Sequence, residues 1–229
     1  MTVTNVLHRD VYLYNEVDRL TGLRAGTARR WINGYSRNGR DYAPILREQR
    51  RDTEWVTWGE FVETRILAEY RDQKAVKTTR LRAAVDALRQ EFQIDYPLAR
   101  YRPYIDIRPQ HIELDLKLSS EEGRLIIETG QMILTDGRPL IERAQLAEDE
   151  SGEKFAEQIS SDLTYPGIVL HPGRFGGQPT FEGRRVSVET IAGIVAYGEP
   201  VEDVAATYGL SIVQVRSASE YAAKYRLAA

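Results

Sequence analysis

Arginine side chains gather in the first fifty residues, where their charge suits an anionic partner. Residues 1–51 hold ten arginines against five acidic residues, a net charge of +5, whereas residues 103–229 hold twelve basic against twenty acidic residues, a net charge of −8. A guanidinium is a planar fork that pairs with phosphates and with guanine edges. A basic head on an acidic body therefore predicts that the N-terminal part of the chain binds nucleic acid.

The elements that would position these arginines are predicted over residues 13–35. Leu13, Val17 and Leu20 recur at helical steps, and Gly22 can end that helix because glycine takes positive φ at no steric cost. A second helix would then turn its apolar side towards the first, as in a helix-turn-helix. The alternative is an ordinary pair of core helices. The residues expected to contact DNA, including those of the next segment, are Arg24, Thr27, Arg29, Arg30, Tyr35, Arg37 and Arg40.

Two glycine-centred turn signals, at Asn33-Gly34 and Asn38-Gly39, flank Tyr35 and predict a small hairpin. In a winged helix this hairpin is the wing, and Arg37 and Arg40 at its tip would reach the DNA backbone. The alternative is a surface loop without a ligand.

These residues resemble the N-terminus of the MerR-like winged helix-turn-helix family. The resemblance covers about the first third of the chain and departs from the family at Asp18, where such motifs carry a small apolar residue. Asp18 must therefore find a partner, or the helices must pack more loosely. The matching residues are Glu16-Val17, Thr21-Gly22-Leu23, Thr27, Arg29-Arg30-Trp31 and Gly34-Tyr35.

Composition restricts the classes of protein that remain. The 229-residue chain has no cysteine, which excludes disulfides and thiolate metal sites, and no apolar run long enough to span a membrane. The N-terminus lacks the layout of a signal peptide, so we expect a cytoplasmic protein. No nucleophile–base pair, metal-ligand spacing or phosphate loop is present, and the acidic run 147–157 suits a solvated loop. We expect neither an enzyme nor a cofactor.

Beyond the hairpin, helices are predicted from about residue 57 to 70 and from 78 to 92. Thr57 would cap the first, with Glu60 completing a capping box. The two helices would either form a dimer seam or complete the core of the N-terminal domain. Alternating or short apolar runs then predict a small antiparallel sheet, with strands at 104–107, 111–118, 125–127 and 132–134.

A glycine-rich segment after Ile168 carries a second resemblance. Gly176, Gly177, Pro179, Gly183, Arg185, Val186 and Val188 fit a short bacterial domain of unknown function. That domain is found beside PIN-domain ribonuclease toxins and is classed with VapB-type antitoxins. The resemblance, over about sixty residues, implies a PIN-domain ribonuclease as partner, with a cation presented to its carboxylates. Arg184, where threonine is commoner, is a mild departure.

Three helices are predicted after residue 188, again in a helix-turn-helix order. Their outer face carries a single cation, Arg216, so this unit is expected to bind protein, because duplex binding depends on neutralising phosphates. Besides Lys224, the candidate partner-binding residues are Arg174, Arg184, Arg185, Ile212, Val213, Tyr221 and Arg226.

Together these features predict an α+β protein, mainly helical with a small antiparallel insertion. The expected domains are a DNA-binding domain at 1–95, a β-rich region at 96–165 and a trihelical protein-binding domain at 166–229. The expected function is an antitoxin that binds its own operator as a dimer. The alternative is a MerR-like regulator without a toxin, whose central sheet senses a ligand.

Overall fold

The computed structural model describes residues 6–73, 77–105 and 120–227. The chain divides into two compact units, Met1–Glu157 and Gln158–Ala229. The boundaries expected at 95/96 and 165/166 differ from this division, because the helices that follow residue 96 pack on those before it. The mixture of helices with small antiparallel sheets confirms the α+β class.

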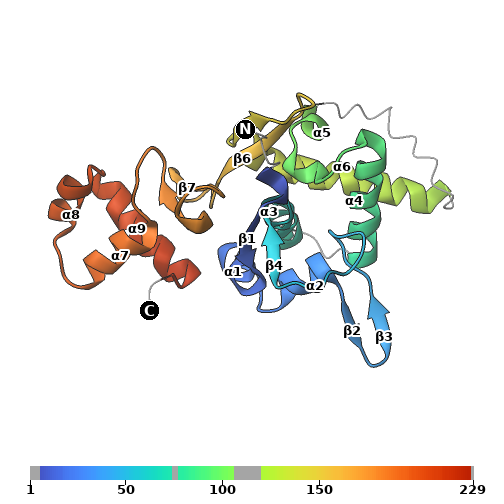
Figure 1. Cartoon of the computed structure of the whole chain (residues 1–229), viewed down its shortest axis with the longest axis horizontal. Coiled ribbons are helices and arrows are strands. Elements are labelled where there is room, and N and C mark those ends of the chain that lie inside the picture. The colour runs from blue at the N-terminus through green and yellow to red at the C-terminus, as the bar shows by residue number, and fades with distance from the viewer. Residues whose placement is uncertain (1–5, 74–76, 106–119, 228–229) are drawn as a thin grey trace. The chain divides into compact units, whose positions relative to one another are not determined.

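Short elements form the N-terminal part of the first unit (Figure 1). Two seven-residue helices, α1 and α2, follow strand β1, and the hairpin β2–β3 projects beyond them. Strand β1 pairs antiparallel with β4, which leads directly into α3. The elements are a 3₁₀ turn Val6–His8, β1 Asp10–Leu13, α1 Tyr14–Leu20, α2 Thr27–Asn33, β2 Tyr35–Arg37, β3 Arg40–Tyr42 and β4 Trp55–Thr57.

Helices α3 (Trp58–Gln73), α4 (Thr78–Phe92) and α6 (Ser120–Glu142) form the core of this unit. The predicted capping box is confirmed, since Thr57 Oγ1 accepts from the Glu60 amide at 3.3 Å and Glu60 Oε2 accepts from the Thr57 amide at 2.9 Å. The apolar faces of α3 and α4 both pack on α6. Helices α3 and α4 therefore complete the core of their own unit, which is one of the two alternatives that the sequence left open. Their apolar faces do not need a dimer interface to be buried.

The strands predicted at 125–127 and 132–134 are wrong, because both runs belong to the long helix α6. The two runs lie seven residues apart, which is two helical turns. Small residues let this helix approach its neighbours closely. A Cβ atom added at Gly137 would lie 2.6 Å from Ile66 Cγ2 on α3.

The strand predicted at 104–107 is also wrong where it is described, since Tyr104 lies in the short helix α5 (Arg102–Ile105) after a 3₁₀ turn at Pro97–Ala99. The strand predicted at 111–118 lies outside the described residues. The observed sheet comes later in the chain, in the order β5-β6-β7-β8. Its strands are β5 Gln145–Glu148, β6 Lys154–Ser160, β7 Ile168–Leu170 and β8 Thr180–Phe181.

The second unit contains three helices after β8, as predicted: α7 (Val188–Ala196), α8 (Val201–Tyr208) and α9 (Ile212–Tyr225). Ser187 caps α7, and Ser211 forms a capping box with Gln214 at the start of α9. Helix α8 ends at Gly209, whose φ of 63° is a left-handed conformation. Helix α9 packs on α7 and α8 and carries more buried apolar residues than either of them.

Candidate functional site

Asp18 fixes the position of α2 relative to α1. Its carboxylate accepts from the backbone amides of Gly26 at 2.6 Å and Ala28 at 2.7 Å, at the first turn of α2. Burial raises the pKa of this carboxyl, while the amides of Ala28 and Gly26 act in the opposite direction. The departure from the MerR-like pattern is thus resolved by a partner, because Asp18 supplies the N-terminal cap that Gly26 itself lacks.

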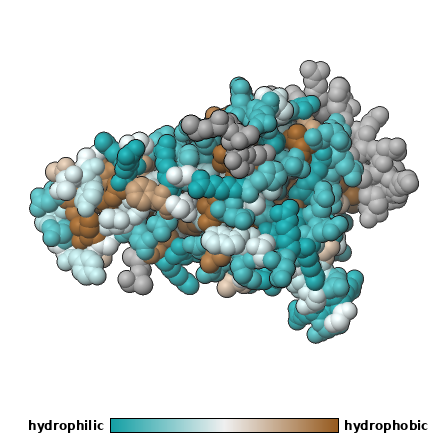
Figure 2. Space-filling model, in the orientation of Figure 1, coloured by the Kyte–Doolittle hydropathy of each residue, from teal (hydrophilic) through white to brown (hydrophobic). Residues whose placement is uncertain are grey.

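The hairpin β2–β3 turns through Asn38 and Gly39, whose φ values of 52° and 72° suit a tight hairpin turn. Tyr35 and Tyr42 face each other and stack with ring centroids 4.4 Å apart. Gly34 at its base has no room for a side chain, since an added Cβ atom would lie 2.5 Å from the Tyr42 carbonyl oxygen. The predicted hairpin is therefore confirmed, and Figure 2 shows it mainly in hydrophilic colours.

Arg37 and Arg40 are directly opposite each other across this hairpin. Within the described ranges, neither has a carboxylate partner, and the same holds for Arg24 and Arg30 on the α1–α2 side. Like charges at facing positions destabilise a strand pair, so this pair costs free energy unless an anion lies between or beside them. These four exposed guanidinium groups are available to an anionic partner.

Two residues expected to contact DNA have other roles. Thr27 is buried, with 2% of its surface exposed, and its hydroxyl accepts from Arg30 Nη2 at 3.1 Å. It supports Arg30 and does not lie on the surface. Arg29 is exposed but pairs with Glu54, and its guanidinium lies 4.7 Å from the centre of the Tyr14 ring. Such an exposed pair is weak, so an anionic partner can displace Glu54.

Arg47 was counted in the basic head, but the structure buries it. Its guanidinium forms two hydrogen bonds with Glu60, at 2.7 and 2.9 Å, and others with Tyr14, Asn33 and the Trp55 carbonyl oxygen. One side chain therefore connects α1, α2, β4 and α3. In the sequence, the position of Arg47 directly after the apolar pair Ile45-Leu46 is only a weak sign of this role.

Arg50 is a second positioning residue that sequence reasoning missed. Its guanidinium donates to Ser36 Oγ at 2.9 Å on β2 and to the Tyr42 carbonyl oxygen at 3.2 Å on β3. It also lies 3.5 Å from Asp41. Arg50 thus contacts both strands of the hairpin and holds them to the segment that follows.

Asp162, near the N-terminal end of the second unit, accepts hydrogen bonds from the last turn of α9. Burial would raise the pKa of this carboxyl, but hydrogen bonds from Lys224 at 2.6 Å, the Thr164 amide and the Tyr225 hydroxyl lower it to about 2. Lys224 is therefore already paired. Tyr221, expected on the partner surface, is buried, hydrogen-bonds with Ser161 and packs edge-on against Tyr165, so its assignment to that surface is wrong.

Three arginines predicted to bind a partner come together in the second unit. Arg174, Arg184 and Arg185 line a hollow of about 430 Å³ with Phe175, and no acidic residue lines it. Phe175 is 49% exposed and has a φ of 48°, which is unusual for a bulky residue. Sequence reasoning missed Phe175, although it lies within the glycine-rich motif. We call these four residues the arginine hollow.

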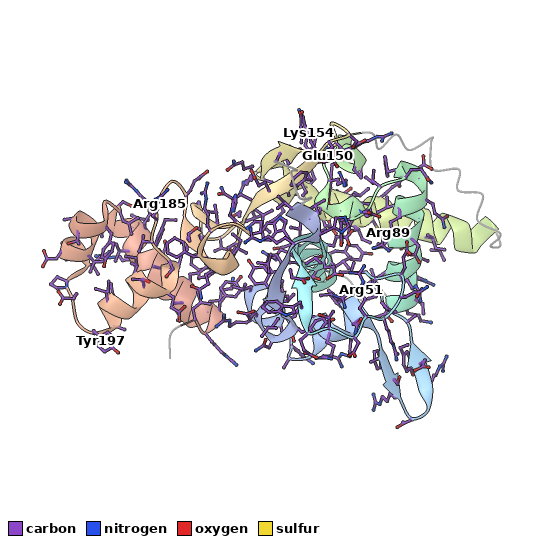
Figure 3. All side chains as sticks on the ribbon, viewed as in Figure 1. Arg51, Arg89, Glu150, Lys154, Arg185 and Tyr197 are labelled. Atoms are coloured by element: carbon purple, nitrogen blue, oxygen red, sulfur yellow. The ribbon has the colours of Figure 1, made fainter. Side chains whose placement is uncertain are left out.

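The other partner candidates lie on exposed parts of the second unit. Ile212 and Val213, at the start of α9, are 41% and 72% exposed, and Arg226 caps the far end of that helix. Because Ile212 and Arg226 lie at opposite ends of α9, the predicted residues are not a single cluster. Sequence reasoning missed Tyr197, after α7, which is 95% exposed and lies on the opposite side of this unit from Arg185 in Figure 3.

Two findings bear on other classes of function. In the part of the chain that the structure describes, no three histidine or acidic residues are grouped to hold a metal ion. Within the same ranges, no helix is both long and apolar enough to cross a membrane.

Comparisons with known proteins agree with this architecture. Residues 168–222 match the family described as "Protein of unknown function (DUF433)". The crystal structure of Rv2018 from Mycobacterium tuberculosis superposes with a TM-score of 0.66 at 19% identity, covering 92% of this chain and 98% of that one, which is a similarity of fold. "Uncharacterized protein Rv2308" of Mycobacterium tuberculosis (strain ATCC 25618 / H37Rv) is 51% identical over 233 residues, covering 100% of this chain and 96% of its own length. This chain belongs to the same protein family as Rv2308.

Proposed function

We propose that this chain is an antitoxin that represses its own operon. Its α1–α2 pair and β2–β3 hairpin form a MerR-like winged helix-turn-helix that binds operator DNA as a homodimer, and its second unit holds a PIN-domain ribonuclease toxin. The observation that carries the proposal is the facing pair Arg37 and Arg40, which has no carboxylate partner among the described residues.

The N-terminal cations support DNA as the ligand. Arg30 is held by Thr27 on a helix that Asp18 fixes in place, while Arg37 and Arg40 extend from a hairpin braced by Arg50. A rigid helix beside a basic hairpin is the arrangement with which winged helices place base contacts and backbone contacts. The lack of carboxylate partners means that binding phosphates does not require breaking ion pairs at these residues.

The arginine hollow supports an acidic protein partner for the second unit. Three guanidinium groups without a lining carboxylate suit the acidic, metal-binding site of a PIN-domain ribonuclease, which the family resemblance suggests. The half-exposed Phe175 and the exposed Ile212 and Val213 provide apolar contact area of the kind found in interface cores. The match of residues 168–222 to DUF433 supports the resemblance from which the toxin partner is proposed.

The DNA-binding part is tested by replacing both hairpin arginines with alanine. If each neutralises one phosphate, the slope of log affinity against log salt should fall by about two in magnitude. Arg143→Ala is the matched control, because Arg143 is an exposed arginine outside this segment. Unchanged slopes in the double variant would remove the hairpin from the DNA interface.

The toxin-binding part is tested with the ribonuclease encoded beside this gene, if one is present there. The full-length Arg184→Ala/Arg185→Ala variant should lose inhibition of that nuclease by about a hundredfold, as expected for losing two charge-assisted contacts of about tenfold each. The Arg143→Ala control should inhibit normally. A double variant that protects RNA as well as the wild-type chain would exclude the arginine hollow, and a neighbouring gene for a ligand-handling enzyme would favour a regulator without a toxin.

A further inference from the structure

A second hollow lined by several arginines lies in the first unit. The segment 46–51 forms one wall, Arg89 of α4 and the pair Asp95–Tyr96 form another, and His8 closes one end, around a volume of about 480 Å³. This volume is within the usual range of small-molecule sites. Arg51 and Arg89, which come from different walls, are labelled in Figure 3. We call this space the Arg51 hollow.

The charged residues that line the Arg51 hollow include more arginines than carboxylates, which favours an anionic ligand. Arg47 and Glu60 at its base neutralise each other through two hydrogen bonds. The remaining lining charges are Arg50, Arg51 and Arg89 against Glu48 and Asp95, with His8 lying 3.8 Å from Asp95. Arg51 is the most available of them. Its side chain is 58% exposed, and its ion pair is a 4.0 Å contact with Glu60, which Arg47 already binds.

The interior behind Arg89 adds to this positive character. Glu63 is fully buried 3.7 Å from Arg89 Nη2, and its Oε2 atom has no hydrogen-bond partner. Burial raises the pKa of Glu63 to about 7, so its negative charge is partly lost near neutral pH. Arg89 also contacts Asp86 at 3.2 Å on its other side. Its guanidinium is thus held in place between the core and the hollow.

The wall of the hollow is bonded directly to both elements of the proposed DNA interface. Arg50 holds the two hairpin strands through Ser36 and the Tyr42 carbonyl oxygen. The backbone of Arg51 holds the end of α2, since its N–H donates to Asn33 Oδ1 at 2.8 Å and its carbonyl accepts from Asn33 Nδ2 at 2.9 Å. Movement of segment 46–51 would therefore move α2 and the hairpin together.

We propose that the Arg51 hollow binds a small molecule bearing a phosphate or carboxylate group, and that its occupancy changes the affinity of the chain for DNA. The binding site stands on its own geometry, whereas its effect on DNA rests on the function proposed above. An anion bridging Arg51 and Arg89 would draw segment 46–51 towards α4. This movement would change the hydrogen bonds that the segment makes with Asn33 and with the hairpin.

The binding step is tested with the full chain and no DNA, using inorganic phosphate, citrate and AMP as probes at constant ionic strength in calorimetry and thermal unfolding. At least one probe should bind saturably, and Arg51→Ala should weaken it by about tenfold, the loss of one charge-assisted contact. Arg51→Lys should recover part of the affinity, because it keeps the charge and loses the fork. Phosphate or AMP binding would identify a phosphate ligand and citrate binding a carboxylate.

Two results would overturn the site. One is the absence of saturable binding for all three probes, and the other is equal binding by wild type, Arg51→Ala and the Arg143→Ala control. The regulatory step is then measured as the change in DNA affinity caused by the bound probe. A shift in wild type but not in Arg51→Ala supports the coupling, while equal shifts refute it. Failure of DNA binding without any probe is a separate result, which would refute the proposed function.

Discussion

Replacing Asp18 tests whether the contact between α1 and α2 fixes the proposed DNA-binding helix. The buried carboxylate uses two oxygens for two amides, at 2.6 and 2.7 Å. Asp18→Asn keeps the shape but can accept only one of these bonds, because its amide nitrogen faces the other N–H group. One buried donor left unpaired should cost about 1–2 kcal/mol of unfolding free energy, and Asp18→Ala, which loses both bonds, about 2–4 kcal/mol.

The measurements are urea unfolding and DNA affinity on the same samples. Affinity should fall in the order wild type, Asp18→Asn, Asp18→Ala, because the first turns of α2 carry Arg29 and Arg30. Asn15→Ala is the control, since Asn15 lies on the exposed face of α1. The reasoning fails if Asp18→Ala unfolds at the same urea concentration as the control. It also fails in its functional part if the variant loses stability but binds DNA normally.

Four other substitutions test the packing and the buried charges. Gly34→Ala should destabilise the first unit by about 2 kcal/mol or more, because the new side chain meets both a positive φ and a clash with the Tyr42 carbonyl oxygen. Gly39 also has a positive φ but open space around it, so Gly39→Ala should cost only about 1 kcal/mol. Equal unfolding free energies for the two variants would contradict this. Burial raises the pKa of Glu63 from 4.5 to about 7, so its contribution to stability is fully present below pH 4.5 and about 3 kcal/mol of it is lost as pH rises through 7. Glu63→Gln should remove this pH dependence of the unfolding free energy, measured by urea unfolding between pH 5 and 8. The same pH dependence in the variant as in the wild type would disprove it. Despite the burial of Asp162, hydrogen bonds lower its pKa from 3.8 to about 2, so the carboxylate contributes about 2 kcal/mol of stability above pH 4 that is lost as pH falls through 2. The Asp162→Asn variant should therefore have a lower melting temperature than the wild type at pH 7. An unchanged melting temperature would show that the carboxylate is not needed.

Local signals in the sequence predicted the N-terminal and C-terminal elements well. Glycine and asparagine at the turns located the β2–β3 hairpin, and the Thr57–Glu60 capping box located the start of α3. Such signals act between residues a few positions apart, so they survive the tertiary context. The three helices of the second unit were predicted for the same reason.

The failures came where packing between distant segments decides the structure. The short apolar runs at 125–127 and 132–134 predict strands, but both lie in α6, which packs on α3 and α4 and buries Ile126, Ile133 and Leu134. Tyr221 is predicted on a surface, but the structure buries it and pairs its hydroxyl with Ser161, sixty residues earlier in the chain. No spacing rule shows which polar residue finds a buried partner, since that partner comes from the fold.

The buried guanidinium of Arg47 has a consequence for how the N-terminal segment unfolds. Helices α1 and α2 have seven residues each, too few to persist alone in water. Both are bonded to the same charged group, which cannot be left without partners in the interior. Loosening of either helix removes a hydrogen bond from this buried guanidinium, whose charge Glu60 still neutralises, so the two helices should open together. The arginine-bearing face of this chain should therefore form and be lost as a whole, and its stability should depend on the Arg47–Glu60 ion pair.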